Sequence, residues 1–173
     1  MSLILETRRM VLRNFIRADV ERYPQIRDAV SHPHEPAAEL AAERSRELAR
    51  GYIAAADCQP RLDYQLAMLE RVDGRLIGSC GVCLHGRGAR SAEFNCEVAA
   101  DWQRQGLALE AGEALLAVVF RDLGLENVSA RIPAENLAGQ GLADRLGMRA
   151  VDPTETPAVL YTIGASEWTR SSS

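Results

Sequence analysis

The sequence predicts a mixed α+β fold, in which a central, mostly antiparallel twisted sheet is flanked by helices. Residues 64–70, 76–84 and 92–98 have strand patterns and are joined by short turns, one of them at Asp73-Gly74. An apolar stripe of helical period over residues 107–123 follows the last of these strands. Three strands in series followed by a long helix are typical of the α+β class.

The first part of the chain predicts one strand and two helices. Residues 3–16 carry large apolar side chains among arginines, which favours a strand. Asp19 is suited to cap a helix over residues 19–30, because a short acidic side chain accepts from the free N–H groups of a first turn. A second helix is expected over residues 38–56, whose apolar residues fall roughly on one face.

The loop at residues 31–37 contains two histidines. His32 and His34 stand beside Glu35, and these side-chain types can bind a metal ion. The sequence supplies no distant ligand to complete such a site, so a solvated loop that lines a substrate cleft is the favoured interpretation. No metal site is predicted.

The C-terminal part predicts a strand over residues 127–132, a helix capped by Asn136, and a final hairpin over residues 148–151 and 159–163. No internal repeat, low-complexity block or domain boundary interrupts the chain. We therefore expect residues 1–165 to form a single domain and residues 166–173 to be a frayed tail.

Composition excludes several classes of function. With 173 residues and 47% hydrophobic content, the chain has the size and make-up of one globular domain. A formal net charge of −4 and the lack of a basic cluster argue against nucleic-acid binding. No apolar run has the length of a membrane span, and no signal-peptide pattern opens the chain. The four cysteines lack a second closely spaced pair, so we interpret them as reduced thiols of a cytoplasmic protein, either monomer or homodimer.

The chain contains arginine but no lysine, and this excludes the kinds of active site that need a lysine. Without lysine there is no Schiff-base chemistry with pyridoxal phosphate and no Walker-type phosphate loop. The glycine patterns of a dinucleotide-binding fold and of a nucleophile elbow are also missing. Any phosphate-binding turn in this chain must therefore serve another kind of ligand.

One turn has the features of such an anion site. Gln103-Arg104-Gln105-Gly106-Leu107-Ala108 lies between the strand at residues 92–98 and the helix that follows. The first N–H groups of a helix lack internal partners and, with the helix dipole, attract an anion. Gly106 lets a ligand approach the backbone, and the small Ala108 keeps the next turn clear. An ordinary strand-to-helix connection would have the same pattern, so the turn alone does not decide.

Four segments carry a resemblance to a known family. Gln103-x-x-Gly106-x-Ala108 resembles the acetyl-CoA signature of the Gcn5-related N-acetyltransferase (GNAT) superfamily. The segment Glu6-Thr7-Arg8-Arg9-Met10-Val11-Leu12-Arg13 resembles the opening of its ribosomal-protein N-terminal acetyltransferase (Rim-type) branch. Further similar segments are Ala92-Glu93-Phe94, Asp101-Trp102 through Glu110-Ala111, and Asn136-x-x-Gly139-x-x-Leu142 through Gly147-Met148. The order of predicted elements is similar from end to end.

The resemblance implies the GNAT fold, with a sheet splayed between its fourth and fifth strands, and acetyl-CoA as cofactor. It implies that the turn holds the CoA pyrophosphate and that the strand ending at Val98 pairs with the pantetheine arm. Asn136 is expected to contact the pantetheine or a catalytic water. The implied cofactor-binding residues are thus Val98, Gln103, Arg104, Gln105, Gly106, Leu107, Ala108 and Asn136.

The implied reaction is acetyl transfer to a primary amine by direct attack in a ternary complex. Such attack needs orientation and a route for the amine proton. Glu93 is the candidate for that route, and Glu97, on the same strand face, is the second candidate. A surface or ion-paired glutamate is the competing interpretation of Glu93. The acceptor is expected to be a protein N-terminus or a small amine.

Two positions depart from the family pattern. Where many members have a tyrosine that protonates the leaving thiolate, this chain has Ala143, and where the Rim-type branch has serine, it has Gly139. Tyr161 and Cys96 are possible replacements that the sequence does not place. A second hypothesis follows, in which the chain is a weak or inactive CoA-binding sensor or partner module.

Overall fold

The computed structural model describes residues 3–27, 38–151 and 157–171. Across these residues the strands are β1 (Ile4–Glu6), β2 (Met10–Asn14), β3 (Leu66–Glu70), β4 (Leu76–Leu84), β5 (Ser91–Val98), β6 (Asn127–Pro133), β7 (Arg149–Val151) and β8 (Ala158–Gly164). The helices are α1 (Arg17–Val20), α2 (Ala38–Asp57), α3 (Leu107–Arg121), α4 (Leu137–Arg145) and α5 (Ala165–Ser171), with short 3-10 turns η1 (Tyr23–Gln25) and η2 (Ala100–Trp102).

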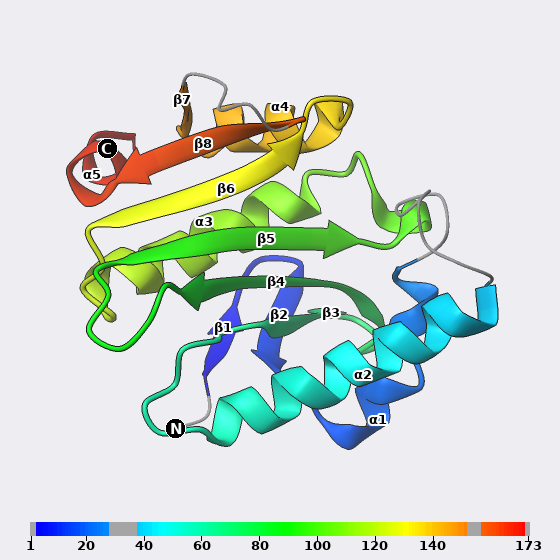
Figure 1. Ribbon diagram of the computed structural model, residues 1–173. Helices are drawn as coiled ribbons and strands as arrows, with labels where there is room; N and C mark the ends of the chain where they lie inside the picture. The colour runs from blue at the N-terminus through cyan, green and yellow to red at the C-terminus, as the bar shows by residue number, and fades with distance from the viewer. Residues whose placement is uncertain (1–2, 28–37, 152–156, 172–173) are drawn as a thin grey trace.

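The strands form one sheet in the order β1-β2-β3-β4-β5-β6-β8-β7. Every neighbouring pair is antiparallel except β5 and β6, which are parallel. In Figure 1, α2 crosses one face of the sheet while α3 lies behind β5 on the other face. The predicted fold class, a mostly antiparallel sheet flanked by helices, is confirmed.

Two apolar clusters hold the layers together. The larger joins α3, α4 and Trp168 of α5 to one face of the sheet, and the alternating strand residues Leu66, Met68, Val82 and Phe94 belong to it. The smaller joins α1, η1 and α2 to the opposite face around Tyr23, which contacts Phe15 edge to face with ring centroids 5.1 Å apart. Strands β3 and β4 contribute residues to both clusters, with Ala67 and Leu76 in the smaller one.

The N-terminal strand expected over residues 3–16 is two strands. The Thr7 N–H and hydroxyl both donate to the Met10 carbonyl, at 2.9 and 3.1 Å, and these bonds close a tight turn between β1 and β2. The turn, Thr7-Arg8-Arg9, contains no glycine or proline, so no turn residue in the sequence marked the break between the two strands.

The helix expected over residues 19–30 is a short helix α1 followed by η1, with Pro24 at the start of η1; residues 28–30 are outside the described part. Asp19 is not its N-cap. It lies in the first turn of α1, where its carboxylate accepts from the Ile16 N–H at 2.8 Å and from Arg13 at 2.7 Å. The predicted loop 31–37, with His32 and His34, also lies outside the described residues.

The expected frayed tail at 166–173 is wrong over its described part. Residues Ala165–Ser171 form helix α5, and Trp168 is only 6% exposed and belongs to the main core. Its indole lies against Phe120 of α3, with ring centroids 6.1 Å apart. One large aromatic side chain thus anchors the chain end.

Candidate active site

The two parallel strands in the middle of the sheet separate soon after they pair. Strands β5 and β6 are in register only from Ser91 to Glu93, opposite Asn127 to Ser129. Beyond Glu93 the strands diverge and leave a pocket of about 140 Å³. The pocket is lined by Phe94, Asn95 and Cys96 of β5, by Ala130, Arg131, Ile132 and Pro133 of β6, and by Asn136, Gly139, Leu142, Ala143 and Met148. The expected splay is therefore present.

The backbone of β5 beside this pocket has hydrogen-bonding groups that face away from β4. The Ala99 N–H donates to Ile77 and the His85 N–H to Ser91, so the odd-numbered residues of β5 form the hydrogen-bonded pairs with β4. The N–H and C=O of Cys96 consequently point toward β6, which has diverged at that level. An extended chain lying in the pocket could pair with them as an added strand.

The carbonyl of Val98, the last residue of β5, is already in use. The Gln103 side-chain amide donates to it at 2.8 Å. Gln103 therefore ties the start of the signature turn to the end of β5. This places Val98 at the junction between the open strand edge and the turn, where a ligand would pass from one to the other.

The turn itself has two residues in the left-handed region. Arg104 has φ 60° and Gly106, the N-cap of α3, has φ 77°. Within the described part of the chain no side chain caps α3, and the N–H groups of its first turn have no partner within the helix. The structure thus brings residues 103–108 together as an uncapped helix start, which suits an anion such as a pyrophosphate.

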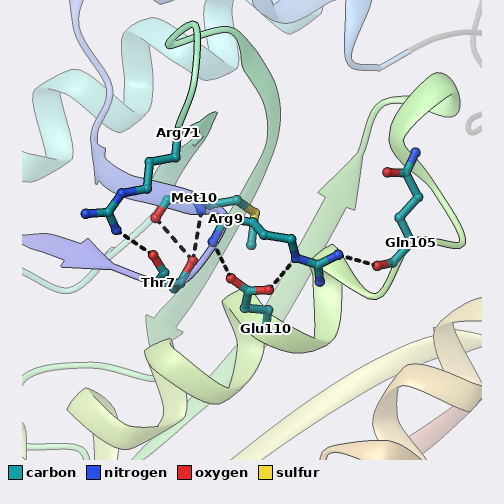
Figure 2. Close-up of polar contacts among 6 residues, drawn as sticks. All are labelled: Thr7, Arg9, Met10, Arg71, Gln105 and Glu110. Carbon is teal, nitrogen blue, oxygen red and sulfur yellow. Dashed lines mark hydrogen bonds and ion pairs between the residues drawn. The ribbon is translucent and has the colours of Figure 1, made fainter.

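Two residues that the sequence did not assign to the site support this turn. Figure 2 shows Arg9, in the β1–β2 turn, reaching Glu110 in the first turn of α3. The Arg9 Nε donates to Glu110 at 2.7 Å, and its Nη1 donates to the Gln105 carbonyl at 2.8 Å. Burial raises the pKa of Glu110, but hydrogen bonds from Thr7 and Arg9 outweigh it and keep that pKa below its usual value. Both residues lie in family-like segments, yet spacing in sequence could not show that they meet.

Asn136 caps α4 as expected. Its side-chain oxygen accepts from the Gly139 N–H at 2.9 Å, and the residue lines the pocket between β5 and β6. Ala143 and Cys96 line the same pocket, whereas Tyr161 is buried in the core and does not line it. Of the two possible replacements for the family tyrosine, Cys96 is the one at the pocket.

Glu93 lies where β5 and β6 begin to diverge, at the last position where the two strands pair. Its side chain is 42% exposed, and its nearest ion partner is Arg131 of β6, with Nε 4.0 Å away. Its neighbour on β4 is Cys83, whose backbone forms an isolated antiparallel β-bridge with Asp63. Glu93 is therefore a partly exposed carboxylate on the sheet face opposite α3.

Glu97 lies on the same face as Glu93 but in different surroundings, four residues or about 13 Å farther along the strand. The Tyr23 hydroxyl donates to one of its oxygens at 3.0 Å, and the Arg27 Nε donates to the other at 3.2 Å. Behind Tyr23, the Gln65 amide donates to the Ser79 hydroxyl, which lies 3.0 Å from the Tyr23 oxygen. Burial and the charge of Glu97 raise the pKa of Tyr23 well above its usual value, so Tyr23 stays a donor.

A second, more open pocket of about 520 Å³ adjoins this face. It is lined by Arg27, Arg44, Glu47, Leu48, Gly51, Tyr52 and Asp63. Burial raises the pKa of Asp63, and this outweighs the lowering by the hydrogen bond from the Gln65 N–H and by the positive charge of Arg61. Cations and carboxylates thus share one hollow on the side of the sheet opposite α3.

Comparison with known proteins decides the family. The profile of the acetyltransferase (GNAT) domain family matches residues 9–149. The chain belongs to the GNAT acetyltransferase family. It is accordingly an acetyl-CoA-dependent N-acetyltransferase, as the sequence predicted. A search of curated proteins by sequence found no match.

Solved structures agree on the fold of this acetyltransferase. RimJ from Mycobacterium smegmatis, solved with CoA-disulfide, is 20% identical with a TM-score of 0.74, and the match covers 96% of this chain and 88% of that one. The ribosomal-protein-S5-alanine acetyltransferase of Vibrio fischeri is 12% identical, with a TM-score of 0.74 and coverage of 96% and 98%. FdhC, a nucleotide-linked sugar GNAT, is 14% identical, with a TM-score of 0.81 and coverage of 98% and 94%. The fold is thus shared by proteins whose names point to different acceptors.

Proposed function

We propose that this acetyltransferase binds acetyl-CoA along the open edge of β5, with the pyrophosphate at the turn Gln103–Ala108. The observation that carries the proposal is the junction at Val98, where an unpaired strand edge meets an uncapped helix start. The strand edge suits an amide-bearing pantetheine arm, and the helix start suits a pyrophosphate. Asn136 contacts the arm from across the pocket.

When bound, acetyl-CoA supplies an acetyl group activated as a thioester. The acceptor amine would attack the thioester carbonyl directly in a ternary complex, from the sheet face that carries Glu93; the C–S bond would break, and CoA would leave as a thiolate that solvent protonates. Glu93 accepts the amine proton, directly or through water, because its carboxylate is accessible and only loosely paired. Glu97 is held by Tyr23 and Arg27, and we assign it to the support of that face.

The acceptor is a primary amine, either a protein N-terminus or a small molecule. The first choice is supported by the Rim-type opening segment and by the likeness in fold to RimJ and to the S5-alanine enzyme. The second is supported by the pocket around Tyr52 and Asp63, whose roughly 520 Å³ suits a compact molecule. Its mixture of arginine and carboxylate side chains favours an amine that also bears a negative group.

The test is release of the CoA thiol from acetyl-CoA in the presence of a panel of acceptors. The panel contains peptides with the N-termini of ribosomal proteins, polyamines, amino acids and amino sugars. Amine-dependent release that falls in Glu93→Gln supports the proposal. If CoA binding survives the bulky change Gly106→Val, the proposed cofactor turn is wrong.

A second candidate is a CoA-binding module without turnover. It is supported by Ala143 and Gly139, which stand where family members have hydroxyl side chains. Tight CoA binding with no thiol release on the whole panel would favour it. If slow release of the CoA thiol is seen instead, Cys96 is the first residue to substitute, because its thiol lines the pocket.

A further inference from the structure

The guanidinium group of Arg9 holds one peptide group of the cofactor turn. Its Nη1 donates to the Gln105 carbonyl at 2.8 Å, and its Nε donates to Glu110 at 2.7 Å (Figure 2). The Arg9 backbone is fixed as well, because its N–H donates to Glu110 at 2.8 Å and its carbonyl accepts from the Arg71 N–H at 2.9 Å. Arg9 therefore reaches the turn from a rigid base.

The bond to Gln105 decides which way the next amide points. In a trans peptide the C=O and the following N–H point in opposite directions. With the Gln105 oxygen turned to Arg9, the Gly106 N–H must point away from Arg9. Glycine accepts positive and negative φ about equally, so Gly106 at φ 77° permits this orientation without enforcing it.

We propose that Arg9 is a positioning residue for acetyl-CoA. It locks the Gln105–Gly106 peptide so that the Gly106 N–H joins the amides of the first α3 turn in facing the pyrophosphate. Glu110 fixes Arg9 in place through a charge-assisted pair. The inference rests on the proposed cofactor turn and adds to it a residue that lies 96 positions earlier in the chain.

Charge gives Arg9 a second contribution to the same site. Glu110 is an acid in the first turn of α3, close to where a pyrophosphate would bind, and it would repel that anion if unpaired. Arg9 neutralises it. The remaining Nη2 of Arg9 lies beside Gly106, 3.5 Å from where a Cβ would stand, and adds positive potential at the turn.

The decisive variant is Arg9→Ala, because it removes the side chain while the backbone bonds of residue 9 to Glu110 and Arg71 remain. CoA should bind about ten- to one-hundred-fold more weakly, as expected for losing charge-assisted hydrogen bonds. The same loss should appear in kcat/KM for acetyl-CoA through a raised KM. Acetyl-pantetheine, which lacks the pyrophosphate, should be used with unchanged kcat/KM, a result that a general loss of structure would not give.

The matched control is Arg71→Ala. Arg71 lies beside the same β1–β2 turn and donates from Nη1 to the Thr7 carbonyl at 2.7 Å, but it has no contact with Gln105 or Glu110 among the described residues. Its loss should leave the affinity for CoA unchanged. Arg9→Lys, which keeps the charge without the fork of donors, should give an intermediate affinity.

Glu110→Gln alone is an independent arm if Arg9→Ala folds poorly: it weakens the contact that fixes Arg9 and should therefore lower the affinity for CoA. Combined with Arg9→Ala, it should recover part of the affinity for CoA, because the unpaired acid is gone while the peptide stays unlocked. Equal losses for acetyl-CoA and acetyl-pantetheine in Arg9→Ala would overturn the positioning role. So would normal CoA binding in Arg9→Ala and Glu110→Gln, provided that Gly106→Val abolishes binding; if that variant binds CoA normally, the cofactor turn itself is wrong.

Discussion

The Tyr23 hydroxyl donates to Glu97 at 3.0 Å. This hydrogen bond distinguishes Glu97 from Glu93, the other candidate catalytic carboxylate. Tyr23 is 1% exposed and stays protonated, so it is a permanent donor to Glu97. Among the residues that the structure describes, Glu93, on the same strand, has its ion-pair contact with Arg131 at 4.0 Å. One carboxylate is built into a network, and the other is 42% exposed.

The first prediction contrasts these two residues. Glu93→Gln should lower kcat by about 10²- to 10⁴-fold, the usual contribution of general acid–base catalysis, with little effect on stability. Glu97→Gln should instead destabilise the fold by about 1.5–3 kcal/mol, because Arg27 and Tyr23 lose a charged acceptor. Steady-state kinetics and urea unfolding of both variants check this. A larger kcat loss in a stable Glu97→Gln would reverse the assignment.

The second prediction concerns alkaline pH. Burial, then the charge of Glu97, raises the pKa of Tyr23 above that of tyrosine in the unfolded chain, which is about 10. Above that pH the unfolded chain loses a proton that the folded protein keeps, so the free energy of unfolding falls as pH rises. Tyr23→Phe removes this group and should make the fall less steep. Urea unfolding between about pH 8 and 11 measures it.

At neutral pH the same Tyr23→Phe variant should lose about 1–3 kcal/mol, since the Ser79 hydroxyl is left buried without its tyrosine partner. Tyr52, whose pKa burial also raises, provides the comparison. An unchanged pH slope in Tyr23→Phe, together with a flattened slope in Tyr52→Phe, would assign the effect to Tyr52 instead.

Sequence patterns located the central part of the fold well. Residues 64–70, 76–84 and 92–98 correspond to β3, β4 and β5 because strand alternation and turn residues act over short distances. The same local signals placed the helix start at Gly106 and the cap at Asn136. They missed the β1–β2 turn, which the side chain of Thr7 closes without a glycine.

Contacts between side chains that are far apart in the chain could not be predicted from the sequence. Arg9 and Glu110 are 101 positions apart, and only the packing of the β1–β2 turn on α3 brings them together. Likewise, the surroundings of Glu97 differ from those of Glu93 because of Tyr23 and Arg27, which come from a separate layer. The sequence pattern identifies which residues carry charge on one face, but it does not say which charges are already paired.

The third prediction concerns Gly139, where the resemblance to the Rim-type branch leads us to expect a serine. A Cβ at Gly139 would lie 2.8 Å from the Asn136 amide nitrogen, so Gly139→Ser should disturb the cap of α4 and cost about 1–2 kcal/mol. It should not raise kcat. In the same helix, a Cβ at Gly141 meets no atom within 4 Å, and Gly141→Ser should be neutral or stabilise by about 0.5 kcal/mol. Thermal unfolding of the pair checks the prediction; equal stability of the two variants would contradict it.

The fourth prediction tests the end of the chain. Trp168 is 6% exposed and packs on Phe120, so Trp168→Ala should lower the free energy of unfolding by about 3–5 kcal/mol. Truncation after residue 165 should have a similar effect, because it removes the same side chain from the core. Val72→Ala, at a side chain that is 92% exposed, is the control and should change stability by less than about 0.5 kcal/mol. If the truncated protein unfolds at the same urea concentration as the full chain, α5 contributes nothing to the core and the tail is dispensable.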